Sequence, residues 1–436
     1  MSTDAITTPP SAVAFKDALK KGLGRAMLLL KAEPGSHLLQ AELARACKIN
    51  LVYDSQCEEP RAAYLYRLIR ETGQVQFYMA TLSRCLGDGT EEGEESDLTQ
   101  AFCVLCLAAA DERDFDRSVL YDFLARGDFA SMFAFVGLEG IEGLLRCVRK
   151  AYHAFNDNFS EEDGWAFRSL VEALVNRDGA EKAAASLHDA RSSCDELDRL
   201  MSLNESKSAP AVSKDASVTD DAAAEAAFEK GCAFPRAWIA AATDEALARI
   251  ADALLAERDE SKIRGYLRVF RIRTFPRSPR SLFPLAQSEN RRVAHVAADA
   301  LGRIHDPDVR ALAFEFLSEG KSLELAVKLL RRNFRPGDFN HIEDALASKN
   351  LDDDAWHRFG FSLLDVIRNN EVSANESRRL LFRLYEEGPC SMCRTDIVAR
   401  LRASGGVPDW MAEECLFDAN PETARLFAET ETSGQG

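Results

Sequence analysis

The stretch Asn290–Leu317, NRRVAHVAADALGRIHDPDVRALAFEFL, decides the fold because it contains two helical patterns joined by a short turn. Apolar residues recur at intervals of three and four on both sides of the turn, which predicts two amphipathic helices. Ala297 and Gly302 have small side chains that let neighbouring helices approach closely. Asp306 and Pro307 predict the start of the second helix, because aspartate caps helix N-termini and proline is suited to the first turn.

Paired helical patterns of this kind continue through the second half of the chain. Alternation of β-branched residues is almost absent throughout, so we predict an all-α protein. The starts of successive pairs are 28 to 37 residues apart, a spacing typical of helical-hairpin repeats. Neighbouring pairs must stack, because one hairpin cannot bury its apolar face alone. The predicted pairs are 243–257 with 260–273, 278–287 with 290–304, 306–318 with 321–334, 336–348 with 353–369, 373–387 with 391–403, and 407–417 with 420–429.

Within the first stretch, Ala297-Ala298, Ala300-Leu301-Gly302 and the turn Asp306-Pro307-Asp308-Val309-Arg310 resemble a HEAT repeat. This resemblance implies an α-solenoid whose second helices line a concave side. Four shorter motifs resemble those of a group of bacterial HEAT-like proteins without assigned activity, which implies an α-solenoid in both halves and supplies no catalytic residue. They are KGLGR at 21–25, YDSQCE at 53–58, LEGIEGL at 138–144 and PCSMCR at 389–394.

Composition divides the chain into two lobes. Residues 202–225 contain no aromatic side chain and no apolar stripe, so we predict a flexible linker there. The linker separates an N-terminal helical-hairpin lobe, 1–201, from a HEAT-like lobe, 226–436. The acidic stretch Asp88–Asp97 is predicted to be a solvated loop. Hairpins predicted in the first lobe are 60–72 with 74–86 and 97–110 with 113–125.

The overall charge limits the classes of partner. With 71 acidic and 54 basic side chains, the formal charge of −17 argues against coating nucleic acid or an anionic membrane with the whole surface. Residues 1–12 lack a secretory pattern, and the longest apolar run, Ala101–Ala110, is about half of what a spanning helix needs. Eleven cysteines, several within apolar helical patterns, are typical of a reducing compartment. We expect a cytoplasmic protein without disulfides, cofactor or membrane contact.

Positive charge nevertheless concentrates between residues 262 and 335, where 16 Lys or Arg accompany 7 Asp or Glu. These cations fall on three successive second helices, so their faces are expected to merge into one basic strip. Guanidinium groups make paired hydrogen bonds to carboxylates and phosphates. We therefore predict a non-catalytic protein that binds a macromolecular partner, with another protein favoured and no small-molecule substrate identified. The predicted partner-binding residues are Arg264, Arg268, Arg271, Arg292, Arg303, Lys328, Arg331 and Arg335.

Two alternatives for the basic strip stay open. Arginines also solvate exposed helix faces, and Asp299 and Glu324 would neutralise part of the positive field. A nucleic-acid backbone binder would use the same strip, and its affinity would fall steeply with salt. Its contacts would be Arg268, Arg271, Arg292, Arg331 and Arg335.

A third hypothesis is an enzyme. Some HEAT-like proteins are DNA glycosylases that pair an aspartate with aromatic residues, and Asp352–Asp354 followed by Trp356 offers those residue types. Aspartates directly before a helix are ordinarily capping residues, so this interpretation is the least favoured. No glycine-rich phosphate loop of Walker type and no HExxH motif occurs in the sequence.

Two cysteine pairs have the C-x-x-C spacing of metal and redox sites. Cys103 and Cys106 lie in an apolar helical pattern, where this spacing predicts buried thiols. Cys390 and Cys393 have no second pair nearby to complete four zinc ligands, and His341 and His357 are distant in sequence. We therefore predict buried thiols here too and no metal site, with a metal or redox role as the alternative.

Overall fold

The computed structural model describes residues 12–54, 58, 61–88, 98–112, 114–124, 129–152, 161–208, 228 and 234–428. Every regular element in these segments is a helix, so the all-α prediction is confirmed. The chain divides into unit 1, with residues 1–212, 390–392 and 408–436, and unit 2, with residues 213–389 and 393–407. The predicted acidic loop beyond Asp88 lies outside the described residues.

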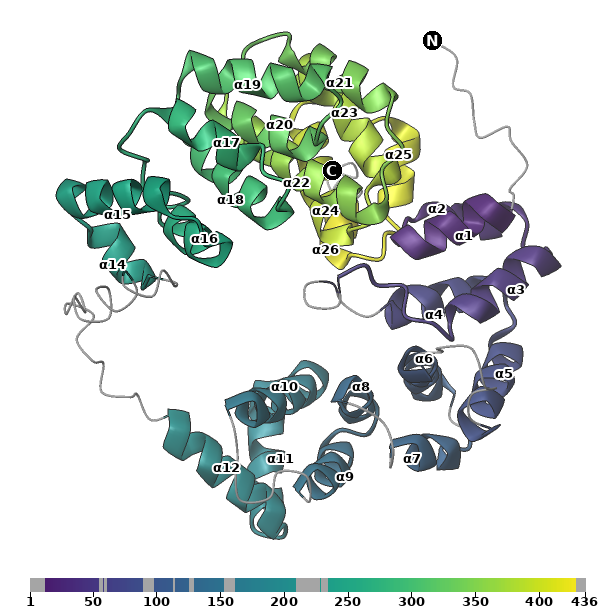
Figure 1. Ribbon diagram of the computed structural model, residues 1–436. Helices are drawn as coiled ribbons and strands as arrows, with labels where there is room; N and C mark the ends of the chain where they lie inside the picture. Colours follow the sequence, from purple (N-terminus) through teal and green to yellow (C-terminus); the bar gives the residue numbers. More distant parts are fainter. Residues whose placement is uncertain are drawn as a thin grey trace, which may run out of the picture. The chain divides into compact units, whose positions relative to one another are not determined.

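Unit 1 consists of short helices that pack mainly against near neighbours in the sequence (Figure 1). The hairpins predicted in the first half are present, since α4 and α5 follow one another and so do α6 and α7. The helices are α1 (Ala12–Lys21), α2 (Arg25–Ala32), α3 (His37–Ala46), α4 (Ala62–Glu71), α5 (Val75–Asp88), α6 (Leu98–Asp111), α7 (Ser118–Leu124), α8 (Phe129–Glu139), α9 (Ile141–Tyr152), α10 (Glu161–Asp178), α11 (Ala180–Arg191), α12 (Asp195–Ser208), α25 (Asp409–Cys415) and α26 (Pro421–Ala428).

The last two helices belong to unit 1, whereas the sequence analysis assigned the whole of 226–436 to the second lobe. Arg25 of α2 pairs with Glu414 of α25, with 2.5 Å between Nε and Oε1. Gly24 permits this close approach, since a Cβ there would lie 1.7 Å from the Glu414 carbonyl oxygen. These partners are 389 residues apart, so no local pattern in the sequence marks their contact.

The predicted linker also begins too early. Helix α12 continues to Ser208, past the expected boundary at residue 201. Side-chain hydrogen bonds support its second half: Arg191 donates to Ser202 at 2.9 Å, and Arg168 donates to Asn204 at 2.8 Å. Residues 209–227 lie outside the described residues.

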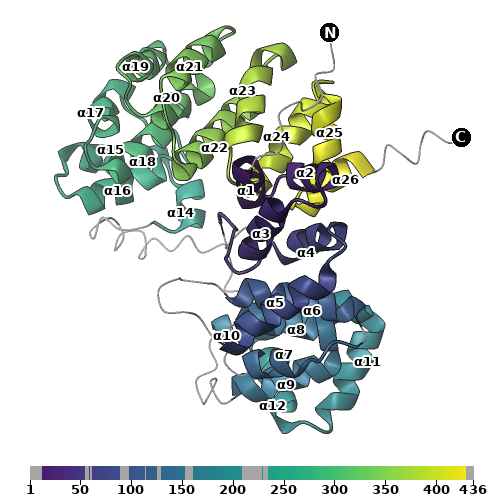
Figure 2. The ribbon, with the colours of Figure 1, turned by 90° about the vertical axis from the view of Figure 1, so that its right-hand side faces the viewer.

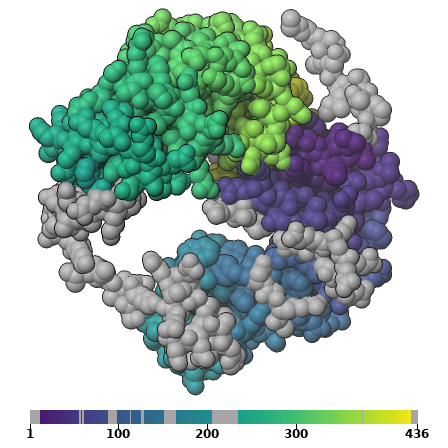
Figure 3. Space-filling view, in the orientation of Figure 1, coloured from purple at the N-terminus to yellow at the C-terminus, as the bar shows by residue number. Residues whose placement is uncertain are grey.

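Unit 2 contains two rows of helices, and its teal-to-green atoms form one continuous body in the space-filling view (Figure 3). In the first row α17, together with η1, is followed by α19, α21 and α23, and in the second row α16, α18, α20 and α22 pack in succession (Figures 1 and 2). The elements are α14 (Arg236–Ala241), α15 (Asp244–Ala256), α16 (Glu260–Val269), η1 (Pro279–Leu282), α17 (Phe283–Ala286), α18 (Arg291–Leu301), α19 (Pro307–Ser318), α20 (Leu323–Leu329), η2 (Leu330–Arg332), α21 (Asp338–Ala347), α22 (Asp353–Asn369), α23 (Ala374–Glu387) and α24 (Ser391–Ala403).

Local chemistry accounts for the α18–α19 hairpin. Asn290 caps α18, and Asp306 caps α19 by accepting hydrogen bonds from the amides of Asp308 and Val309. Each cap satisfies backbone donors that have no partner within the first turn. Gly302 lets the end of α18 approach the next helix, because a Cβ there would lie 2.2 Å from the carbonyl oxygen of Lys328.

Candidate functional site

Polar contacts join the helices of the second row at regular intervals. Between α18 and α20, Nδ1 of His295 lies 3.0 Å from Oε1 of Glu324, and Nζ of Lys328 lies 2.9 Å from Oδ1 of Asp299. From the first contact to the second, the chain moves forward by four residues on α18 (His295 to Asp299) and by four on α20 (Glu324 to Lys328). The two helices therefore run parallel, with these side chains on facing sides.

The same arrangement extends to both neighbouring helices. Between α20 and α22, Arg358 lies 3.1 Å from Glu324. From η2, Arg331 lies 2.8 Å from Asp365 of α22. Towards α16, Nε of Arg271 lies 3.1 Å from Oδ2 of Asp299, and Asn290 donates to Glu260. We call this surface the ladder face, and its residues are Glu260, Arg271, Asn290, His295, Asp299, Glu324, Lys328, Arg331, Arg358 and Asp365.

Three of the predicted partner-binding residues are thus neutralised within the ladder face. Arg271 and Lys328 share Asp299, and Arg331 pairs with Asp365. The pairing reduces the positive charge that these side chains present to a ligand. This pairing agrees with the alternative in which the arginines solvate exposed helix faces and Asp299 neutralises part of their charge.

Five predicted residues make no ion pair with another described residue: Arg264, Arg268, Arg292, Arg303 and Arg335. Arg268 and Arg292 are exposed. Arg292 lies three residues before His295 on α18, so helical spacing places it on the ladder face. The Nε atoms of Arg264 and Arg303 are buried and donate a hydrogen bond to no described residue.

Arg303 lies in the most crowded positive environment of this surface. Burial lowers the pKa of its guanidinium group, and the charges of Arg331 and Arg332 lower the pKa further, while Asp365 opposes them. Arg332 was not among the predicted residues. An anion bound here would relieve repulsion among the three arginines.

Arg335 does not lie on a helix face. The prediction extended the helix to residue 334, whereas η2 ends at Arg332. Asn333 ends it by donating to the carbonyl oxygens of Leu329 and Ile304 at 3.0 and 2.8 Å. Arg335 lies in the turn before α21, where its backbone amide donates to Asp338.

Glu324 is the central acceptor of the ladder face. Burial would raise the pKa of its carboxyl group, but the hydrogen bond and charge of His295 and the charges of Lys328 and Arg358 outweigh burial and lower the pKa. The carboxylate is therefore held ionised beside His295, Lys328 and Arg358. It ties α18, α20 and α22 together.

The aspartates considered for a glycosylase have capping positions. Asp352 is the N-cap of α22, and its side chain accepts from the amide of Ala355 at 2.7 Å. Asp354 is 66% exposed and lies 3.5 Å from Arg358. Trp356 is buried and packs edge-on against Phe359. This arrangement matches the capping interpretation.

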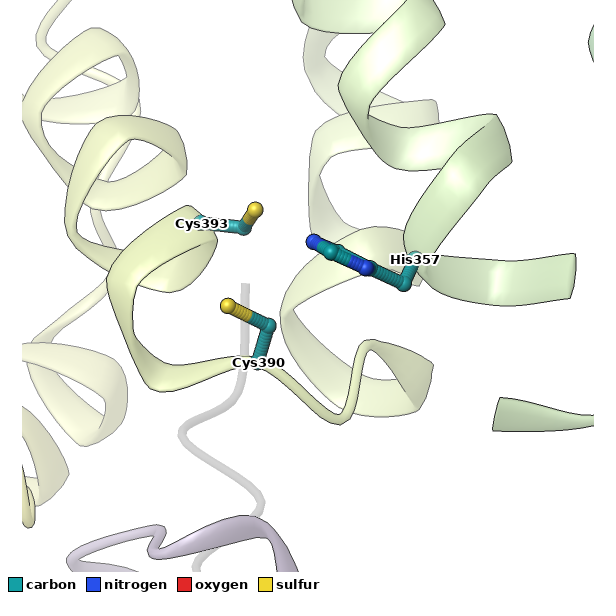
Figure 4. A group of neighbouring side chains, drawn as sticks. All are labelled: His357, Cys390 and Cys393. Atoms are coloured by element: carbon teal, nitrogen blue, oxygen red, sulfur yellow. The ribbon is translucent and has the colours of Figure 1, made fainter. Parts of the chain in front are cut away.

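A cluster of metal-ligating side chains lies where α24 begins. The sulfur atoms of Cys390 and Cys393 and a ring nitrogen of His357 all lie within 4.8 Å of one another (Figure 4). Cys390 directly precedes α24, Cys393 lies in its first turn, and His357 projects from α22. Cys390 is 5% exposed, while Cys393 and His357 are half-buried. The sequence analysis found no third ligand for this pair, and the structure supplies one.

The other C-x-x-C pair differs. Cys103 and Cys106 are buried within α6, as predicted. Burial raises the pKa of the Cys106 thiol, and Cys103 adds to the effect. Neither cysteine belongs to a metal-ligating group among the described residues.

The comparisons with known proteins supply no family. No protein-family model matches the chain, and no curated protein sequence matches it. None of the helices formed by the described residues has both the length and the apolar character that spanning a bilayer requires.

Proposed function

We propose that the chain is a non-catalytic, cytoplasmic binding protein with two α-solenoid lobes. Its HEAT-like second lobe would bind an acidic segment of another protein on the ladder face. The repeat assignment is supported by the two rows of helices and by polar contacts between residues 29 to 34 positions apart on neighbouring second-row helices. Stacked hairpins present one extended surface to one extended ligand.

The observation that carries the proposal is the set of arginines left without an ion pair beside the ladder. Arg268 and Arg292 are exposed cations, and Arg303 lies beside Arg331 and Arg332. Each offers a planar donor group that suits a carboxylate. Because fixed ion pairs already hold their neighbours in place, the surface would lose little entropy when a partner binds.

The alternating charges favour a protein over nucleic acid. Carboxylates of Asp299, Glu324 and Asp365 interrupt the basic residues of the ladder face. A phosphate backbone presents uniform negative charge and would be repelled at these positions. A protein segment can place its own lysines opposite them, so mixed charges give specificity rather than general attraction for polyanions.

A titration with defined probes tests this proposal. Fluorescence anisotropy of the full-length protein would be measured with a labelled glutamate-rich peptide that also carries lysines at intervals, a single-stranded RNA and a duplex DNA. We expect the peptide to bind, with Arg268→Glu/Arg292→Glu weakening it about tenfold or more. Binding of the nucleic acids alone, with steep salt dependence, would favour the backbone-binding alternative instead.

The control is a second double charge reversal. Lys262→Glu/Arg379→Glu changes the net charge equally but away from the ladder face, since Lys262 lies about 120° around α16 from Arg268 and Arg379 is on α23 of the first row. We expect this variant to bind the peptide as the unaltered protein does. Equal loss in both variants would show that net charge alone governs binding and would refute the site.

A further inference from the structure

We propose that Cys390, Cys393 and His357 bind a zinc ion. The three side chains converge from α22 and the start of α24 (Figure 4). This site is separate from the ladder face, and the inference does not depend on the proposed binding of an acidic partner.

The separations of the ligand atoms suit tetrahedral zinc after small side-chain rotations. With Zn–S of about 2.3 Å and Zn–N of about 2.0 Å, tetrahedral angles require S···S near 3.8 Å and S···N near 3.6 Å. The three ligand atoms lie within 4.8 Å of one another. A contraction of about 1 Å therefore completes the site, which rotation about the Cα–Cβ bonds supplies.

The donor set selects zinc among the common cellular metals. Two thiolates and one imidazole are soft and borderline ligands, which magnesium and calcium avoid. Two thiolates also cancel the charge of Zn²⁺. This matters because Cys390 is 5% exposed and an isolated charge there would be poorly solvated.

Three protein ligands leave the fourth coordination position for water. Cys393 and His357 are half-buried, so one side of the cluster is open to solvent and gives the metal a path of entry. Zinc sites with three protein ligands generally keep such an exchangeable position.

The turn that holds the two cysteines is fixed from within the fold. Ser391, between them, donates its amide to Glu58 at 3.0 Å and its hydroxyl to the same carboxylate oxygen at 2.5 Å. Glu58 in turn pairs with Arg61 at 3.1 Å. The first turn of α24 then keeps both sulfurs on one side of the helix, since residues three apart are neighbours there. A site held in this way loses less entropy on binding metal than a mobile one.

Metal analysis of the untagged, full-length protein tests the proposal. After incubation with Zn²⁺ and removal of unbound ion, we expect about one zinc per chain by mass spectrometry of the elements. Cys390→Ser, Cys393→Ser and His357→Gln should each reduce zinc affinity at least tenfold. Cys85→Ser and His341→Gln are the controls, since Cys85 is also half-buried and His341 lies on α21, and they should retain the metal.

A second measurement needs no substitution and so does not depend on the variants folding. Zn²⁺ should slow alkylation of Cys390 and Cys393 by iodoacetamide but leave Cys85 unchanged, as read by peptide mass spectrometry. Co²⁺ should give a thiolate-to-metal absorption band. Zinc content far below one per chain with unchanged alkylation rates would overturn the proposal. A Cys390–Cys393 disulfide in protein purified under reducing conditions would overturn it as well.

Discussion

Replacing Glu324 by glutamine should loosen the contacts among α18, α20 and α22 while keeping the shape of the side chain. The carboxylate is 9% exposed and lies 3.0 Å from His295, 3.5 Å from Lys328 and 3.1 Å from Arg358. Hydrogen bonds to charged groups contribute roughly 1.5 to 3 kcal/mol each when partly buried. Because Lys328 keeps Asp299 as a partner, we expect a total loss of about 1.5 to 3 kcal/mol rather than the sum.

Hydrogen exchange of the full-length protein measures this loss locally. Some amides of α20 and α22 exchange by local opening, which costs less free energy than global unfolding. These amides should exchange about 10 to 150 times faster in Glu324→Gln than in the unaltered protein at neutral pH. The control, Glu319→Gln, removes one surface pair with Lys321, whose side chain is 44% exposed. It should change exchange by less than about threefold.

The difference in amide exchange between the unaltered protein and Glu324→Gln should also depend on pH. The folded-state pKa of Glu324 is lowered, so its contribution is complete above the unfolded-state pKa and is lost as pH falls through the folded-state value. The unaltered protein and Glu324→Gln should therefore converge in strong acid. If Glu324→Gln exchanges no faster than Glu319→Gln at neutral pH, the ladder face does not stabilise unit 2 and this reasoning is wrong.

Three further predictions concern single positions. Gly302→Ala should lower the melting temperature of the full chain, measured by circular dichroism. The new Cβ would lie 2.2 Å from the Lys328 carbonyl oxygen, and the resulting strain costs about 2 kcal/mol. An unchanged melting curve would contradict this prediction. Asp306→Ala should lower the free energy of unfolding by about 1 kcal/mol, because the N-cap of α19 is lost, and should raise amide exchange in α19 roughly fivefold. Unchanged exchange would show that the cap does not stabilise α19. Burial raises the pKa of the Cys147 thiol to about 12, so at pH 8 it should be alkylated more slowly than half-buried Cys85, and equal rates would be inconsistent with its burial.

Most of the helices in unit 2 were predictable because their signals are local. The predicted helix 353–369 coincides with α22, where Asp352 caps the first turn and Trp356 and Phe359 begin the apolar stripe. The pair 373–387 with 391–403 agrees with α23 and α24 within one residue. Caps, prolines and apolar spacing act over a few residues, so sequence alone reveals them.

Contacts between distant residues were not predictable in the same way. No local pattern in the sequence indicates that Glu414 pairs with Arg25, so the predicted lobe 226–436 includes the last two helices, whereas they belong to unit 1. The pairing of Arg331 with Asp365, 34 positions later, was missed for a different reason, because the repeat period was compared only between helix starts and not between individual residues. Charge counting along the chain identified a basic region but not which of its cations already had partners.

The third ligand of the cysteine pair left a usable signal. Side chains that contact one another between α20 and α22, or between α22 and α24, are about one repeat apart, as with Arg358 and Glu324 at 34 positions and Arg368 and Asp396 at 28. His357 and Cys390 have a similar separation. The repeat period, applied to individual residues rather than to helix starts, therefore predicts their proximity.

Quantitative affinity capture from the native host tests the central claim most directly. The full-length protein, the Arg268→Glu/Arg292→Glu variant and the Lys262→Glu/Arg379→Glu variant would each be used as bait, in lysates with and without nuclease. We expect the first and third to retain the same acidic protein and the second to lose it. Equal recovery of that protein by all three baits, or its loss from all three after nuclease treatment, would contradict the account.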